Sequence, residues 1–194
     1  MSANERSSNA VASISNVVSL GKNRVCLLFF LFASVVAAIP AGKQTRSELL
    51  YGLNKDSSFE QGCFPPCECP IMIDVPVEGT FLLTETGFDG RFYTYDVTEV
   101  NWIVTVNDPP TLVTGSGVYR IGGEFALQQE LSLDLQMGEG EPVEHFDSGL
   151  VPVSKPPSLP FPEIQLTIST NGQVCFDSVF KVSASPSPAT SGGL

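Results

Sequence analysis

Apolar and polar residues alternate with a period of two along much of the chain between residues 71 and 184. The longest such run covers residues 119–137, where the odd positions are mostly apolar and the even positions mostly polar. Because successive side chains of a strand point to opposite faces, this pattern predicts one buried face and one solvated face. The run is longer than an ordinary strand, and Gly122-Gly123 predicts a bend, bulge or break within it. The odd positions are Tyr119, Ile121, Gly123, Phe125, Leu127, Gln129, Leu131, Leu133, Leu135 and Met137.

A second alternating run ends at a pair of prolines. Val100, Trp102 and Val104 are separated by single residues, and Pro109-Pro110 follows shortly afterwards. Proline cannot donate a ladder hydrogen bond, so the strand is expected to end before this pair and the chain to turn. Residues 71–184 show no convincing helical period, and the fold class is therefore predicted to be all-β.

About seven to nine strands of this kind suit either a sandwich or a small barrel. Large aromatic residues are spread along the chain and can fill a core between two sheets. We therefore predict a single antiparallel β-sandwich, cross-linked by disulfides, with a small β-barrel as the alternative. The aromatic residues expected in the core are Phe81, Phe92, Trp102, Tyr119, Phe125, Phe176 and Phe180.

One hairpin can be predicted in detail from the dipeptide Asn171-Gly172. A two-residue loop would place Ser169 opposite Val174 and pair a polar face with an apolar one. A three-residue loop over residues 170–172 pairs Ile168 with Val174 instead. Since a slip of one residue moves every side chain to the other face, burial favours the second register. It predicts a left-handed Gly172 in a bulge.

The N-terminal part of the chain has the layout of a secretory signal peptide. Lys22 and Arg24 precede an apolar run over residues 25–39, and small residues surround Pro40. This order of basic, apolar and small residues predicts a cleaved signal within residues 1–41. The run is shorter than the roughly 20 residues of a membrane-spanning helix. The alternative is an uncleaved N-terminal anchor, in which residues 25–39 would be the only membrane contact.

Composition divides the rest of the chain into three parts. Residues 42–62 mix charges, serine and glycine around one short apolar patch, and are predicted to be a linker or arm. Residues 63–184 are predicted to form the β-domain. Residues 185–194 form a Ser/Pro/Gly tail with little to bury, which predicts disorder.

Four cysteines follow the apolar run: Cys63, Cys67, Cys69 and Cys175. An even number in an exported chain predicts two disulfides, for which three connectivities exist. A bond between Cys67 and Cys69 would be strained. We therefore expect one bond within the cluster and one from Cys67 or Cys69 to Cys175. A metal site is the alternative, but the spacing C-x3-C-x-C lacks the usual C-x2-C pair, so no metal and no cofactor are assigned.

The charge balance excludes one class of partner. The chain has 10 basic and 21 acidic residues, a net charge of −11, and no basic cluster. Removing residues 1–38 would take away three basic residues and one acidic residue, which makes the charge more negative. Such a surface is repelled by phosphate backbones, so nucleic acid is not expected as a partner.

Two motifs are candidates for catalysis, and neither is assigned. His145 is the only histidine, and a strand would place Asp147 on its face. A serine hydrolase would have to use it, but the segment Gly115-Ser116-Gly117 is not a nucleophile elbow. The segment Asp147-Ser148-Gly149 resembles the D-[ST]-G loop of aspartic proteases. That chemistry needs two carboxylates, hence a dimer, and Leu150 replaces the small residue usual after the glycine.

Four segments resemble recurring pieces of uncharacterised exported all-β proteins of environmental bacteria, a group without known activity. The resemblance spans most of residues 62–184. It implies one exported domain and brings no activity, ligand or site residue with it. The segments are GCFPPCECP (62–70), GTF (79–81), VTGSGVYRIGGEFA (113–126) and FDSG (146–149).

These observations together predict an exported, non-enzymatic β-domain with a binding or structural role. It would be secreted or located in the periplasm or cell envelope, or held at the membrane by the N-terminal segment. The rival hypothesis is a secreted carboxylate-dependent hydrolase built on an Asp147 dimer. A third is a β-barrel carrier of an apolar ligand, which needs inward residues too small to fill the interior. The partner itself is not predicted.

Overall fold

The computed structural model describes residues 47–106, 108–153 and 157–187. The predicted signal peptide or anchor (residues 1–41) lies outside the described residues, as does most of the predicted C-terminal tail.

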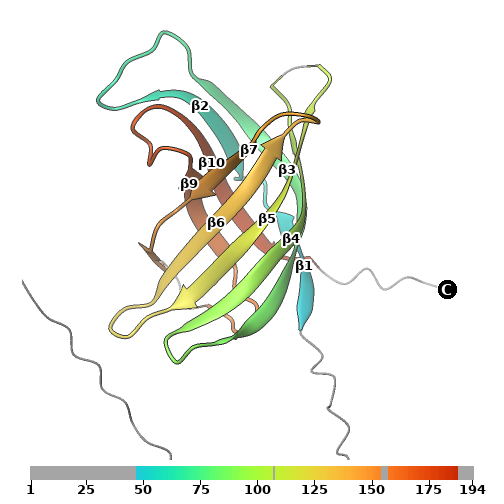
Figure 1. Cartoon of the computed structure of the whole chain (residues 1–194), viewed down its shortest axis with the longest axis vertical. Helices are drawn as coiled ribbons and strands as arrows, with labels where there is room; N and C mark the ends of the chain where they lie inside the picture. The colour runs from blue at the N-terminus through green and yellow to red at the C-terminus, as the bar shows by residue number, and fades with distance from the viewer. Residues whose placement is uncertain (1–46, 107, 154–156, 188–194) are drawn as a thin grey trace, which may run out of the picture. The chain divides into compact units, whose positions relative to one another are not determined.

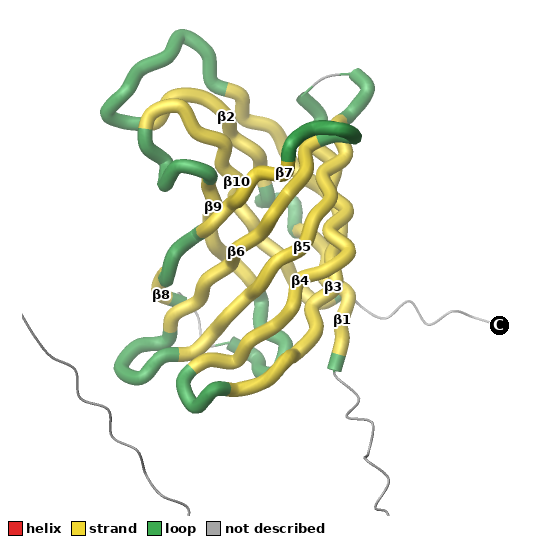
Figure 2. The backbone as a smooth tube through the Cα atoms, in the orientation of Figure 1, coloured by secondary structure: helices red, strands yellow, loops and turns green. Residues whose placement is uncertain are grey.

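The described chain forms one ten-stranded antiparallel sheet (Figures 1 and 2). Hydrogen bonding follows the order β1-β10-β2-β3-β4-β5-β6-β7-β9, with β8 paired to β6. Further pairings of β1 with β3 and of β10 with β9 close the sheet in a ring that is not a regular barrel. The strands are β1 (Glu48–Leu53), β2 (Ser58–Phe64), β3 (Ile73–Phe88), β4 (Phe92–Val104), β5 (Thr111–Gly122), β6 (Gln128–Met137), β7 (Val143–Asp147), β8 (Val151–Pro152), β9 (Ile164–Ser169) and β10 (Cys175–Pro186).

The predicted all-β antiparallel class is confirmed, and so is its alternation. On β6, Leu131, Leu133 and Leu135 are buried, whereas Asp134 between them is exposed. The predicted break is also present, because β5 ends at Gly122 and β6 begins only at Gln128. The sequence pattern alone suits either a sandwich or a barrel. In the structure, the strands form one continuous sheet wrapped around a single core.

Two of the aromatic residues expected in the core lie on the surface. Phe125 is 94% exposed and Phe176 is 64% exposed. Phe125 follows Gly123, whose φ of 141° interrupts the extended chain, so the alternation does not continue through the loop between β5 and β6. Phe176 is the second residue of β10, next to the disulfide-bonded Cys175. The other five expected residues are buried: Phe81, Phe92, Trp102, Tyr119 and Phe180.

Large side chains fill the interior of the ring. The Trp102 and Phe180 rings lie 5.4 Å apart, and Phe146 contacts Phe180 with ring centroids 5.2 Å apart. Tyr51 stacks on Phe81 at 5.3 Å. A β-barrel carrier of an apolar ligand needs inward-facing residues that are small enough to leave a cavity. The described strands have large residues at these inward positions.

The segment predicted to be a linker or arm, residues 42–62, contains β1 and most of β2. Tyr51 and Phe59 from this segment are 0% and 2% exposed. Their partners come from the far end of the chain, since Phe59 lies opposite Phe180 and Tyr51 opposite Pro186. The few apolar residues of this segment are enough for pairing because they occupy inward positions, so the β-domain begins earlier than predicted.

The hairpin register predicted around Asn171-Gly172 is wrong. Ile168 lies opposite Phe180 rather than Val174, and residues 170–178 connect the paired parts of β9 and β10. Gly172 is left-handed as predicted, with a φ of 65°, but within this longer loop. The two-residue register is absent as well, because Ser169 lies opposite Val179. The reason is a carboxylate that organises the loop, described below.

Buried tyrosines fasten the segment between β8 and β9 to the ring. The Tyr51 hydroxyl donates a hydrogen bond to the Pro162 carbonyl at 2.8 Å, and the Tyr95 hydroxyl donates to that of Pro160. Burial raises the pKa of Tyr95 to about 12 and raises the pKa of Tyr51 as well. Both hydroxyls therefore stay protonated and able to donate.

Candidate functional site

Two disulfides lie where β2 ends and β10 begins. Cys63 is bonded to Cys69 and Cys67 to Cys175, with Cα–Cα distances of 5.2 and 4.8 Å. This is the predicted combination of one bond within the cluster and one to Cys175. The second bond ties the loop after β2 to the first residue of β10. Because all four sulfurs are bonded in pairs, none is a thiolate ligand for a metal. Elsewhere in the described residues, no three His, Cys, Asp or Glu side chains form a metal-binding group.

Asp177 organises the loop between β9 and β10. Its side chain is buried in a residue only 1% exposed. Oδ1 accepts hydrogen bonds from the backbone N–H groups of Thr170 (3.1 Å), Asn171 (2.9 Å) and Ser178 (2.8 Å), and from the Thr170 hydroxyl (2.7 Å). Oδ2 accepts the backbone N–H of Gln173 at 2.6 Å. These bonds hold residues 170–173 in a fixed conformation. Sequence reasoning missed Asp177, although an acidic residue beside an Asn-Gly turn is a usable signal.

Two hollows share His145 in their linings. The first, about 390 Å³, is called the β7–β9 hollow and is lined by His145, residues 147–149, Thr167 and residues 169–173. The second, about 490 Å³, is called the β7–β10 hollow and shares His145 and Thr170 with the first. It is also lined by Gln61, Glu144, Phe176, Asp177 and Ser178. Neither lining contains a lysine or an arginine. Their carboxylates disfavour an anionic ligand.

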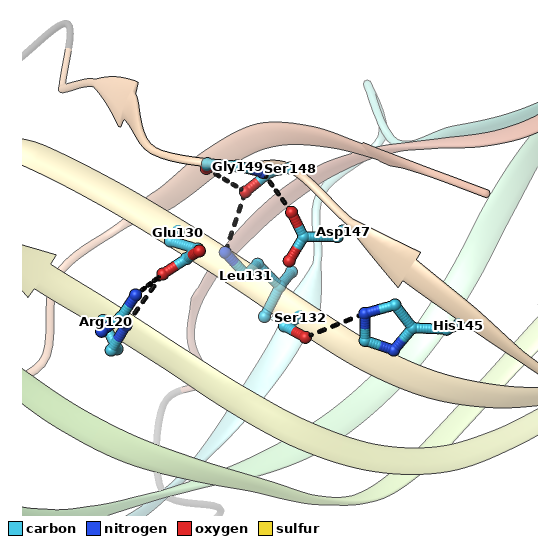
Figure 3. A network of polar contacts seen from close by, with 8 residues as sticks. All are labelled: Arg120, Glu130, Leu131, Ser132, His145, Asp147, Ser148 and Gly149. Carbon is cyan, nitrogen blue, oxygen red and sulfur yellow. Dashed lines mark hydrogen bonds and ion pairs between the residues drawn. The ribbon is translucent and has the colours of Figure 1, made fainter. Parts of the chain in front are cut away.

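His145 lies between a serine and an aspartate of β6. Its Nδ1 is 2.8 Å from Asp134 Oδ1. Its Nε2 is 3.5 Å from Ser132 Oγ, the contact drawn in Figure 3. Register explains the arrangement, because His145 lies opposite Asp134 and Ser132 is two residues away on the same face. Sequence reasoning singled out His145 but considered Asp147 as its neighbour. It missed Ser132 and Asp134, since only strand pairing brings them together.

The order serine, histidine, aspartate is that of a nucleophile, a base and the group that orients the base. The surroundings of Ser132, His145 and Asp134 differ from those of a hydrolase active site. The side chains of His145 and Asp134 are 61% and 64% exposed. Asp147 lies directly opposite Ser132 across the β6–β7 pair. A carboxylate in that position opposes the negative charge that develops on a substrate carbonyl during acyl transfer.

The Asp147-Ser148-Gly149 segment forms a turn after β7 (Figure 3). The Gly149 backbone N–H donates to Asp147 Oδ1 at 2.5 Å. The Ser148 hydroxyl donates to the Gly149 carbonyl at 2.8 Å and accepts the Leu131 N–H at 2.9 Å. Asp147 is the single carboxylate in the lining of the β7–β9 hollow. Within one chain, the motif therefore stabilises a turn and supplies one of the two carboxylates that an aspartic protease needs.

The one basic residue of β5, Arg120, is engaged with other side chains. Arg120 forms an ion pair with Glu130 of β6 (Figure 3). Its guanidinium carbon lies 5.4 Å from the centroid of the Phe92 ring. Because Arg120 is held by Glu130 and Phe92, its positive charge does not offset the acidic character of the hollows.

Comparisons with protein-family models, with curated proteins and with solved structures found no match. Within the described residues, no helix is long and apolar enough to cross a membrane.

Proposed function

We propose that this chain is an exported β-domain that acts by binding outside the cytoplasm, through the two hollows that share His145. The Cys67–Cys175 disulfide is the observation that carries the proposal. Disulfides form and persist in oxidising compartments, and this bond holds the start of β10, which lines the β7–β10 hollow. The rim of the hollow is thus rigid before a ligand arrives, which lowers the entropic cost of binding.

Two features of the sequence support export. The apolar run over residues 25–39 has the layout of a signal peptide, and the four segments resemble uncharacterised exported bacterial proteins. If the run stays uncleaved, it becomes a membrane anchor and the β-domain is displayed at the membrane surface.

Intact-mass analysis tests this proposal. The full chain is expressed in a bacterium that exports it, and the exported protein is alkylated with iodoacetamide under denaturing conditions, with and without prior reduction. We expect a chain that begins near Ile39 and takes up alkyl groups only after reduction, since both disulfides are formed. Retention of residues 1–38 would identify the anchored form. Four alkylated cysteines without reduction would contradict the proposal.

The arrangement of Ser132, His145 and Asp134 favours a second candidate, a secreted hydrolase. We expect a fluorophosphonate probe to leave Ser132 unmodified, because the Asp147 carboxylate opposes the charge that forms during attack. The measurement is peptide mass mapping of the treated protein. An adduct on Ser132 that disappears in His145→Ala would make the hydrolase the better proposal.

The exported protein and two further variants test the carboxylate-dependent alternative. A dimer could bring two Asp147 turns together, and such an enzyme would cleave a denatured protein substrate at acidic pH. Cleavage that Asp147→Asn abolishes, while Asp134→Asn retains it, would replace the binding proposal.

A further inference from the structure

Strand β7 has one paired edge and one largely open edge. It pairs with β6 along its length, whereas on its other side the described residues supply a single pairing, Asp147 with Ser169. The ring is therefore incomplete where β7 runs beside the start of β10. This gap in pairing coincides with the two hollows that meet at His145.

The register shows which backbone groups lie on the open edge. The Ser148 N–H donates to the Leu131 carbonyl at 3.1 Å, so this pair is hydrogen-bonded across β6 and β7. Hydrogen-bonded pairs alternate along an antiparallel ladder. The backbone groups of Phe146 and Glu144 therefore point toward β6, and those of His145 and Val143 point away from it. An added strand can pair with these outward groups.

The charges beside the open edge of β7 determine which kind of peptide strand can bind there. The side chains beside the edge include two carboxylates that a ligand can reach, those of Glu144 and Asp147, which lie on opposite faces of β7, and neither lining contains a lysine or an arginine. Phe176, 64% exposed, offers an apolar surface over which the stem of a lysine or arginine can lie. A second copy of this chain would bring another Glu144 and another Asp147 to the same edge, and the added negative charge disfavours self-pairing there.

We propose that the open edge of β7, Val143–Phe146, binds an extended peptide with basic side chains, which adds to the sheet as a further strand. The proposal rests on the binding function proposed above and names the class of its ligand. Backbone hydrogen bonds to His145 and Val143 supply affinity. Basic residues at alternate peptide positions share one face, where they meet either Glu144 or Asp147.

The probe is the capped hexapeptide acetyl-Lys-Val-Lys-Val-Lys-Val-amide, titrated into the ¹⁵N-labelled, disulfide-bonded exported protein. We expect shifts of the amide resonances of Val143–Phe146, and slower hydrogen exchange at His145 once the peptide covers its N–H. The same peptide with glutamate in place of lysine is the charge control, and it should leave these resonances unchanged.

A matched pair of variants separates the backbone contact from the side chain. His145→Pro removes the outward N–H without touching the ladder to β6, because that N–H points away from β6. His145→Ala removes the imidazole and keeps the N–H. We expect His145→Pro to weaken peptide binding about tenfold, the effect of losing one well-formed hydrogen bond, and His145→Ala to change it by about twofold or less. Glu144→Gln should weaken binding at low salt and have little effect at high salt.

Three results would overturn the proposal. One is the absence of peptide-dependent shifts at β7 at millimolar peptide. Another is an equal loss in His145→Pro and His145→Ala. The third is binding of maltohexaose, a neutral oligosaccharide, at the hollows in place of the peptide. Any of these leaves the proposed export and binding role standing if the exported chain holds both disulfides, whereas four free thiols would remove that role itself.

Discussion

Replacing Cys67 and Cys175 together by alanine is expected to lower the free energy of unfolding by about 4–5 kcal/mol. The bond joins residues 108 positions apart, so in the unfolded chain it closes a very long loop and removes much of its conformational entropy. The measurement is urea unfolding without reductant, followed by the fluorescence of Trp102, the only tryptophan, which is 1% exposed in the folded state.

The Cys63–Cys69 pair provides a matched control. Its sequence separation is 6, so the same entropic argument predicts a loss of about 2 kcal/mol for the double alanine variant. Equal losses in the two double variants, or a larger loss for the short loop, would show that loop closure is not the main source of the stabilisation. Because Cys175 begins β10, the C67A/C175A variant should also loosen the β7–β10 hollow and weaken binding there.

Asp177→Ala is expected to lower the free energy of unfolding by about 3 kcal/mol or more. The carboxylate accepts hydrogen bonds from four backbone N–H groups and one hydroxyl, and alanine removes this acceptor for all five donors. A buried donor that loses its partner costs about 1–3 kcal/mol, and water entering the loop offsets part of the sum. Urea unfolding gives the change in stability, and amide exchange of Thr170, Asn171 and Gln173 gives its location.

Two further variants decide whether the carboxylate itself is responsible. Asp177→Asn keeps an acceptor in the position of Oδ1 but places an NH₂ group where Oδ2 accepts the Gln173 N–H, so its loss should be about half that of alanine. Asp134→Ala removes an exposed aspartate and should change stability by about 0.5 kcal/mol or less. If Asp177→Ala were as mild as Asp134→Ala, the loop would not depend on this residue.

How far the site could be predicted depends on whether its residues are close in sequence. One disulfide within the cluster and one to Cys175 follow from counting cysteines and rejecting the strained neighbour pair, whereas the choice of Cys67 over Cys69 as the partner of Cys175 does not. His145 stands out because it is the only histidine. Its partners Ser132 and Asp134 do not, because a strand from another part of the chain places them there. Asp177 escapes prediction for a different reason, since its hydrogen-bond donors include backbone N–H groups, which carry no side-chain signature.

The errors at the hairpin have the same physical origin. The pattern around Asn171-Gly172 weighs only the local match of polar and apolar faces, and it favours a short loop. In the folded chain, Asp177 stabilises a longer loop through several hydrogen bonds. A disulfide also bonds Cys175 to Cys67, which lies in the loop between β2 and β3. Together these interactions outweigh the pairing of Ile168 with Val174 that local burial favours.

Alternation along the chain by itself determined that this protein is all-β, that β6 buries Leu131, Leu133 and Leu135, and that the long run breaks at Gly122. A period of two decides which face a side chain occupies, and it carries no information about which strand lies alongside. Only the tertiary structure decided that Phe59 meets Phe180, that the sheet closes in a ring, and that β7 keeps an open edge. Those outcomes depend on hydrogen bonds and burial between residues far apart in sequence, which form only when the whole sheet is assembled.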